Sequence, residues 1–239
     1  MSFVYDTPMA DAYLHGRKLR EADVAGWMVA AAPYLPGPGG RILDLGAGTG
    51  RFTAALADTT GATVIACEPS PAMRAVFPAG TPLVGGAAEH LPFARACVDA
   101  VWASQMLHHV RDLEAFARGI RHVLRPGGHL LLRGGFGPPE MIPLHRWFPG
   151  AFTDFGALLT EVTARLATLG VSGTARIQVS QRYAGSAAEL VDKIATRSLS
   201  ELATLPDDVF AAGLRAVRRD APRLDYPLDE RLDLVICVG

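Results

Sequence analysis

Apolar runs along this chain alternate with segments in which apolar residues recur every three or four positions. Five short runs are almost continuously apolar and end in glycine or a polar residue, as expected of strands buried on both faces. They cover residues 41–46, 62–68, 81–86, 98–104 and 128–135. Helical spacing separates them, for example in 111–124, before the sequence RPGG is expected to stop the helix. This alternation predicts an α/β fold with a largely parallel sheet.

The pattern changes after residue 135. The next stretch, FGPPEMIPLHRWFPGAF, is rich in proline and aromatic residues and predicts an irregular segment. A helix at 154–169 and a strand at 175–183 should follow, and then about two helices, one after the capping pattern of Ser186 and Glu189 and one from Pro206. We expect a single domain with four parts: an N-terminal segment (1–37), a core (38–135), a substrate-side segment (136–230) and a closing strand (231–238).

Composition and charge narrow the function classes. The chain has 239 residues, 49% of them hydrophobic, which is enough for one domain with a sizeable core. A formal net charge of −1 with scattered arginines gives no reason to expect nucleic acid or a membrane surface as partner. Because no apolar run reaches about 18 residues and the N-terminus lacks a basic leader region, we expect a cytoplasmic protein. The three cysteines and seven histidines lack metal-binding spacing, so no metal site is predicted.

A glycine-rich turn follows the first predicted strand. In RILDLGAGTGRF, Asp44 is followed by Gly46, Gly48 and Gly50 at every second position. Such glycines let the backbone approach a nucleotide closely, whether a dinucleotide, a phosphate or an adenosyl group. The dinucleotide fingerprint G-x-G-x-x-G has its third glycine one position later, so the spacing leans away from NAD. Glu68, at the end of the next strand, can accept hydrogen bonds from both ribose hydroxyls, which suits NAD and S-adenosylmethionine equally.

Two further motifs stand in register with this turn. They are GGAAEHLPF at 85–93 and VLRPGGHLLL at 123–132. Together with ILDLGAGTG, they resemble class I S-adenosylmethionine-dependent methyltransferases, a group that includes ubiquinone- and menaquinone-biosynthesis-like and bacterial natural-product enzymes. The resemblance is strongest over residues 38–135. It implies a Rossmann-like sheet of seven strands, mostly parallel with an antiparallel last strand, with helices on both faces and S-adenosylmethionine as cofactor.

The same resemblance assigns cofactor roles. It implies that backbone amides of Gly46, Ala47 and Gly48 reach the methionine part of the cofactor. Asp44 would lie beneath the turn and counter the α-ammonium group, and Glu68 would hold the ribose. The residues implied to surround the adenine ring are Pro69, Ser70, Met73, Ala88 and Glu89.

One position departs from the commonest family pattern. Many relatives read Gly-Asp-Ala-Glu where this chain reads Gly86, Ala87, Ala88 and Glu89. The acid that usually accepts from the adenine amino group is therefore missing. Glu89 and a backbone carbonyl are the two candidates to replace it.

Candidate residues for the acceptor side follow the fourth strand. Methyl transfer needs a base only when the acceptor loses a proton as it attacks. Ser104 and Gln105 are predicted to contact the cofactor, because the carboxyl end of that strand lies at the topological switch point. His109, then His108, are candidate bases or substrate contacts, with a structural role for the pair as the alternative. His145 is a third candidate base, lying in an aromatic stretch that could equally be core packing.

These observations predict methyl transfer to a small, largely apolar or aromatic metabolite, with a role in natural-product biosynthesis as one setting. The segment 1–37 is expected to fold over the cofactor as a lid, with Arg17 contacting it, or else to be an ordinary surface helix. Two alternatives remain: a methyltransferase fold that binds the cofactor without transferring methyl, and a NAD-dependent oxidoreductase. The acceptor atom (O, N or C) and the oligomeric state, monomer or homodimer, stay open.

Overall fold

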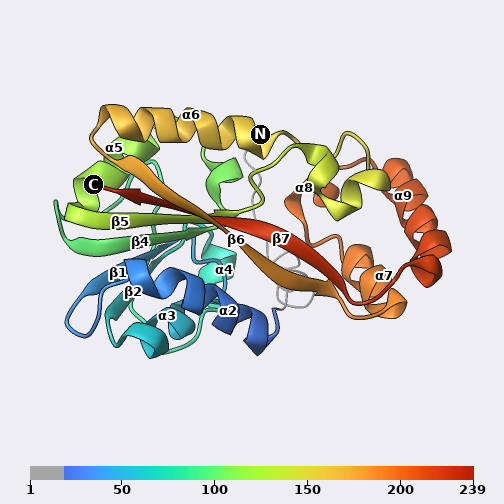
Figure 1. Cartoon of the computed structure of the whole chain (residues 1–239), viewed down its shortest axis with the longest axis horizontal. Coiled ribbons are helices and arrows are strands. Elements are labelled where there is room, and N and C mark those ends of the chain that lie inside the picture. Colours follow the sequence, from blue (N-terminus) through green and yellow to red (C-terminus); the bar gives the residue numbers. More distant parts are fainter. Residues whose placement is uncertain (1–18) are drawn as a thin grey trace.

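A single seven-stranded sheet forms the centre of the molecule (Figure 1). The computed structural model describes residues 19–239, so Arg17 lies outside the described residues. The strands lie in the order β3-β2-β1-β4-β5-β7-β6. The first five strands in this order are parallel to one another, and β7 is antiparallel to both β5 and β6. Their bounds are β1 Arg41–Leu45, β2 Thr63–Cys67, β3 Leu83–Val84, β4 Val98–Ser104, β5 Leu124–Gly134, β6 Ser172–Ala184 and β7 Leu228–Val238. The expected Rossmann-like sheet with an antiparallel last strand is confirmed.

Helices cover both faces of this sheet, with α5 and α6 on one side and α2 and α3 on the other (Figure 1). The α-helices are α2 Glu21–Ala31, α3 Thr53–Thr60, α4 Pro71–Ala75, α5 Leu113–Val123, α6 Phe155–Thr168, α7 Ala187–Ala195, α8 Ser200–Ala203 and α9 Asp207–Asp220. The 3₁₀ turns are η1 Ala32–Tyr34, η2 Leu107–His109, η3 Pro139–Met141, η4 Pro143–Arg146 and η5 Ala221–Arg223.

The continuous apolar runs arise because each central strand is buried on both faces. On β4, Val101 and Ala103 belong to the apolar cluster formed with α5 and α6. Ala100 and Trp102 belong to the opposite cluster, which α2 and α3 complete. Successive side chains of a strand point to opposite faces, so a strand between two helix layers is apolar at every position.

The start of β5 differs from the sequence prediction. The strand begins at Leu124 rather than at 128, so RPGG lies within it instead of only ending the helix before it. Leu124 pairs with Val98, and the register shifts before the next pair, where Gly127 has a φ of +76°. The helix α5 ends at Val123, as RPGG predicts, and residues 125–128 form an irregularity between the pairs Leu124–Val98 and His129–Ala100.

The N-terminal segment contributes to the core. Trp27 and Met28 of α2 are buried against the same side of the sheet as Trp102. Within 1–37, α2 is therefore a packing helix. The lid role stays a prediction, because it falls on residues 1–18, outside the described part of the chain.

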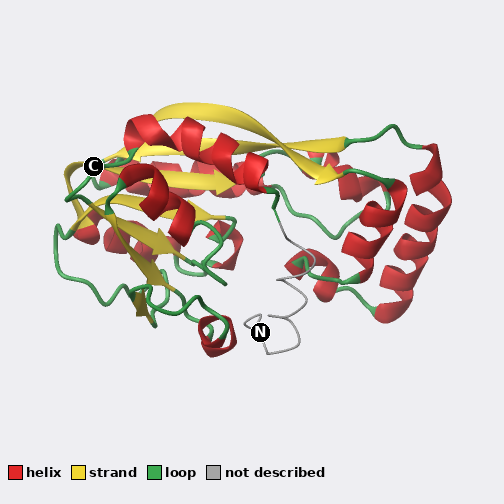
Figure 2. Ribbon diagram, turned by 90° about the horizontal axis from the view of Figure 1, so that it is seen from below, coloured by secondary structure: helices red, strands yellow, loops and turns green. Residues whose placement is uncertain are grey.

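Three α-helices, α7, α8 and α9, lie between β6 and β7, where the sequence predicted two. They share a separate apolar cluster with residues 142–152, and we call these parts together the helical extension. The long strands β6 and β7 run from the core sheet to this extension, as Figures 1 and 2 show. Both strands begin three residues earlier than expected, at Ser172 and Leu228. None of the helices in the described part of the chain is long and apolar enough to cross a bilayer.

Candidate active site

The glycine turn connects β1 to α3 and is held against the end of β2. The amides of Gly46 and Ala47 donate to the carbonyl of Cys67 at 2.8 and 3.2 Å, and the amide of Gly48 donates to Glu68 Oε2 at 2.8 Å. This differs from the expectation that these three amides face the cofactor, because the end of β2 already accepts their hydrogen bonds. The turn would therefore shape the cofactor site more than it would supply backbone amides as hydrogen-bond donors to the cofactor. Gly46 has a φ of +66° and leaves no room for a side chain, since an added Cβ would lie 2.9 Å from Met106.

Two buried acids lie at this turn. Asp44, 2% exposed, accepts a hydrogen bond of 2.6 Å from the Thr53 hydroxyl. Burial, and then the charge of Glu68, raise the pKa of Asp44 to about 7. Glu68 accepts from the amides of Gly48 and Ser70, one at each oxygen and both at 2.8 Å. Burial raises the pKa of Glu68, and these two amides oppose the rise.

The pair of acids fits the methionine and ribose parts of S-adenosylmethionine. Among the described residues no cation lies within ion-pair distance of Asp44 or Glu68, although both are buried. A ligand ammonium group would supply the missing charge for Asp44. Each oxygen of Glu68 keeps a lone pair that can accept from a ribose hydroxyl.

The residues expected around the adenine ring follow Glu68 and β3. Ser70 caps α4 by accepting from the amide of Met73 at 3.3 Å, and the Met73 side chain is buried. Ala88 is buried as well. Glu89 Oε1 accepts from the amide of Arg111 at 2.9 Å, which ties the segment after β3 to the segment before α5. One of its oxygens is thus already engaged, and its role toward adenine stays a prediction.

Arg74 is a residue of this region that the sequence reasoning missed. Its Nη1 donates to the carbonyls of Glu68 and Pro69, both at 2.8 Å. It therefore shapes the turn that presents the Glu68 carboxylate. Its position in the helix immediately after the acid was the available signal.

The pKa of Asp44 leads to a prediction about cofactor binding. Only the ionised carboxylate attracts an ammonium group, and with a pKa of about 7 the ionised fraction rises about tenfold between pH 6 and pH 8. We expect the affinity for S-adenosylhomocysteine to rise by about that factor over this range and then level off. Calorimetric titration at several pH values measures it. Asp44→Asn, which can keep the bond to Thr53, should lose the rise; an unchanged slope would assign it to a titrating group other than Asp44.

The predicted residues after β4 are brought together at the carboxyl edge of the sheet. Ser104 Oγ accepts from Arg133 Nη1 at 3.1 Å, and the amide of Gln105 donates to the Arg133 carbonyl at 2.7 Å. His108 and His109 follow in η2 with their ring centroids 4.0 Å apart. Of the two histidines, His108 lines the cavity described next.

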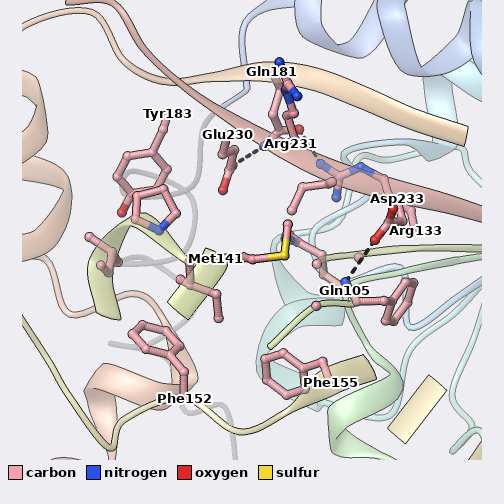
Figure 3. Close-up of a pocket in the computed structure, with 18 of the residues that line it drawn as sticks. Gln105, Arg133, Met141, Phe152, Phe155, Gln181, Tyr183, Glu230, Arg231 and Asp233 are labelled. Carbon is pink, nitrogen blue, oxygen red and sulfur yellow. Dashed lines mark hydrogen bonds between the residues drawn. The ribbon is translucent and has the colours of Figure 1, made fainter. Parts of the chain in front are cut away.

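A cavity of about 440 Å³ lies between this edge of the sheet and the helical extension. One wall is apolar and is formed mainly by the irregular segment after β5, including Phe136, Met141, Ile142, Leu144, Phe152, Phe155 and Leu158. The opposite wall is polar and comes from β6 and β7, including Arg176, Gln178, Gln181, Arg182, Glu230, Arg231 and Asp233. Figure 3 shows Phe152 and Phe155 on one side, facing Gln181, Glu230 and Arg231 on the other. The expected apolar cleft is present, but one of its walls is polar.

His145 is not one of the described residues that line the cavity. It lies in η4, next to Leu144, which does line the cavity. Its Nδ1 is buried without a hydrogen-bond partner among the residues that the structure describes. The structure therefore favours the core-packing alternative for His145 over a base.

Arg133 is the second residue that the sequence reasoning missed. It is 1% exposed, with its guanidinium 4.3 Å from the ring centroid of Trp27 and 5.0 Å from that of Phe52. Its Nη2 and the indole nitrogen of Trp27 both donate to Oε1 of Gln181. A single arginine inside the apolar run HLLLRGG was the signal that could have indicated it. Arg133 thus places a buried polar group in the cavity lining, where β5, β6 and α2 meet.

Comparisons with known proteins agree with this geometry. Residues 43–132 match the family model described as a methyltransferase domain. An uncharacterised methyltransferase of Mycobacterium tuberculosis is 38% identical over 123 residues, 50% of this chain and 47% of that protein. The chain thus spans about half the length of the curated relatives that it matches.

Two solved structures resemble the whole fold. A methyltransferase from an antibiotic biosynthesis pathway of Anabaena variabilis has a TM-score of 0.70 at 24% identity, over 88% of this chain and 95% of that one. A (4+2)-cyclase has a TM-score of 0.60 at 22% identity, over 94% of this chain and 84% of that one.

The fold is Rossmann-like, and the paired acids at the glycine turn fit an adenosyl nucleotide. With the methyltransferase-domain match at residues 43–132, the chain is similar to the class I S-adenosylmethionine-dependent methyltransferases. The methyltransferase-domain match favours this class over the alternative of a NAD-dependent oxidoreductase.

Proposed function

We propose that the protein transfers a methyl group from S-adenosylmethionine to a small molecule whose body is largely apolar or aromatic. The main support for the proposal is that the expected cofactor site at the glycine turn and the cavity border each other. Arg51, directly after the glycine turn, and Gln105, directly after β4, both line the cavity. A molecule in the cavity would therefore lie next to the bound cofactor, whose sulfonium supplies an electrophilic methyl group.

The size and lining of the cavity support a small acceptor. A volume of about 440 Å³ is within the range of small-molecule sites, and one wall is aromatic and aliphatic. The polar wall from β6 and β7 adds hydrogen-bonding groups that can orient one end of the acceptor. A nucleic acid acceptor is disfavoured by the net charge of −1.

Much of the catalysis in such a reaction is positioning and exclusion of water. The helical extension covers the cavity on the side away from the sheet, with Leu199 and Leu202 of the α8 region in its lining. Phe155, at the start of α6, lies beside the ring of His108 with centroids 5.5 Å apart. These side chains are placed to exclude water from the acceptor end.

Mass spectrometry tests this function. The full chain is incubated with S-adenosylmethionine and pools of small phenols, quinones, amines and carboxylic acids, and both S-adenosylhomocysteine and methylated product are measured. Product formation that is lost in Glu68→Gln but kept in Glu161→Gln, an exposed acid on α6, supports methyl transfer. Binding of the cofactor without either product would support the alternative of a fold that binds without transferring. Absence of binding would contradict both.

A further inference from the structure

The lining of the cavity is richer in positive than in negative side chains. Among the described residues, six cationic side chains line it, against four acidic ones. The cations are Arg51, Arg133, Arg176, Arg182, Lys193 and Arg231. The chain as a whole has a formal net charge of −1. Positive charge is therefore concentrated on the surface where the acceptor is proposed to bind, and this favours an acceptor that carries a negative group.

Arg231, on β7, differs from the cations that lie near it in the lining. Arg176 pairs with Asp233 at 2.8 Å, and Lys193 pairs with Glu189 at 3.3 Å. No acid in the described part of the chain lies within ion-pair distance of Arg231. Its side chain is exposed and borders the cavity. The guanidinium of Arg231 is thus available to a ligand.

The alternation of side chains along β7 determines which way Arg231 points. Leu232 belongs to the apolar cluster on the α2 side of the sheet, whereas Val235 belongs to the cluster on the α5 and α6 side. Asp233, on the same face as Val235, accepts from the amide of Phe136. Because side chains two positions apart share a face, Arg231 also points to this side. It lies across the cavity from the aromatic wall, as Figure 3 shows.

Arg182, on β6, adds a second guanidinium on the same face. Ser180 pairs with Arg231, and Arg182 pairs with Asp229 in the register of β6 and β7. Arg182 and Arg231 are therefore diagonal neighbours on one face of the two strands. The Nε of Arg182 is buried and has no hydrogen-bond partner among the residues that the structure describes. With one acid beside them, Asp229, the two guanidinium groups leave an excess of one positive charge.

We propose that Arg231, with Arg182 beside it, binds a carboxylate at the end of the acceptor that lies away from the cofactor. The proposal rests on the proposed methyl transfer. Gln105, which borders the cofactor site, follows β4, and β7 lies two strands further along the sheet, or about 10 Å away. The carboxylate is therefore an anchor, and the methyl group goes to an atom at the other end. A phosphate dianion fits less well, because Asp229 and Glu230 share this wall and would repel it more strongly.

The first test measures binding and is independent of methyl transfer. Calorimetric titration of the full chain, with and without S-adenosylhomocysteine, compares benzoic, phenylpropanoic and naphthoic acids with their uncharged amides. The best acid should bind about tenfold more tightly than its amide, because hydrogen bonds to a charged group are stronger than those to a neutral one. Arg231→Gln should abolish this preference. Arg118→Gln, which removes an exposed arginine on α5, should keep it.

Three outcomes would overturn the proposal. They are a panel in which no acid binds more tightly than its amide, a preference that survives in a folded Arg231→Gln protein, and tighter binding of naphthyl phosphate than of naphthoic acid. A thermal melt of each variant shows that it is folded.

The second test uses the acceptor identified by the product screen. Arg231→Gln should raise KM by about tenfold and leave kcat nearly unchanged, because an anchor remote from the reacting atom stabilises substrate and transition state equally. Fragmentation of the product in the mass spectrometer should show a free carboxylate. A methyl ester as product, or an acceptor without a carboxylate, would overturn the proposal even if methyl transfer is established. If no product forms, the proposed function fails, and the binding test still decides the carboxylate site.

Discussion

Replacing Glu68 by glutamine is expected to weaken the binding of S-adenosylhomocysteine by at least about 100-fold. A hydrogen bond to a charged acceptor contributes about 1.5–3 kcal/mol, and the two ribose hydroxyls would each make one, so a loss of about 3 kcal/mol is a low estimate. The amide of glutamine has a second disadvantage. Both oxygens of Glu68 accept backbone N–H groups, from Gly48 and Ser70, so either orientation of the amide places its NH₂ group against a donor.

Calorimetric titration of the full chain measures this effect, with Glu161→Gln as the matched control. Glu161 is an exposed acid paired with Arg165 on α6, away from the glycine turn. The control should bind like the wild type. A thermal melt of each variant separates loss of binding from loss of folding. A Glu68→Gln protein that is folded and binds within about threefold of the wild type would refute the ribose role.

Replacing Gly213 by alanine should lower the free energy of unfolding by about 2–3 kcal/mol. Gly213 lies inside α9, and an added Cβ would meet Cε1 of Phe148 at 2.2 Å. Phe148 is 2% exposed and stacks on Phe210, with ring centroids 5.9 Å apart, so it has little room to move. Overpacking of this kind typically costs about 1–3 kcal/mol, and a clash this close belongs at the upper end even after alanine's gain in helix propensity.

The chain offers a matched control in Gly26. It too lies inside a helix, α2, but nothing lies within 4 Å of an added Cβ. Gly26→Ala should therefore raise the free energy of unfolding by about 0.5–1 kcal/mol. Urea denaturation of both variants measures the contrast. The double variant Gly213→Ala/Phe148→Leu should be less destabilised than the sum of its single changes, because a smaller side chain makes room for the methyl group. Additive losses, or equal effects at the two glycines, would contradict close packing of α9 on Phe148.

The first half of the site could be predicted because its signals are local. Asp44, the three glycines and Glu68 lie at strand ends, and parallel strands bring their carboxyl ends to one edge of a sheet. The same local reasoning was right about the end of α5, at Val123 just before RPGG, but it placed the start of β5 too late, because Leu124 already pairs with Val98 of β4.

The second half of the site could not be predicted from such signals. Of the three candidate histidines, His108 lines the cavity, and this depends on how η2 and η4 are oriented. Which of them acts as a base stays a prediction. Arg74 and Arg133 were missed because their partners are backbone carbonyls and a glutamine, which no spacing rule connects to them.

By itself the sequence determined the α/β sheet, the glycine turn with its two acids, and the resemblance to a methyltransferase family, since these depend on residue types and spacings within single strand–turn–helix units. Only the tertiary structure decided what borders the cavity. It joined Trp27 to Gln181 across 154 positions, and His108 to Ser200 across 92. Such contacts follow from the paths of β6 and β7 and from the packing of the helical extension. These paths and this packing depend on many weak side-chain contacts between distant segments, and such contacts produce no periodic pattern in the sequence.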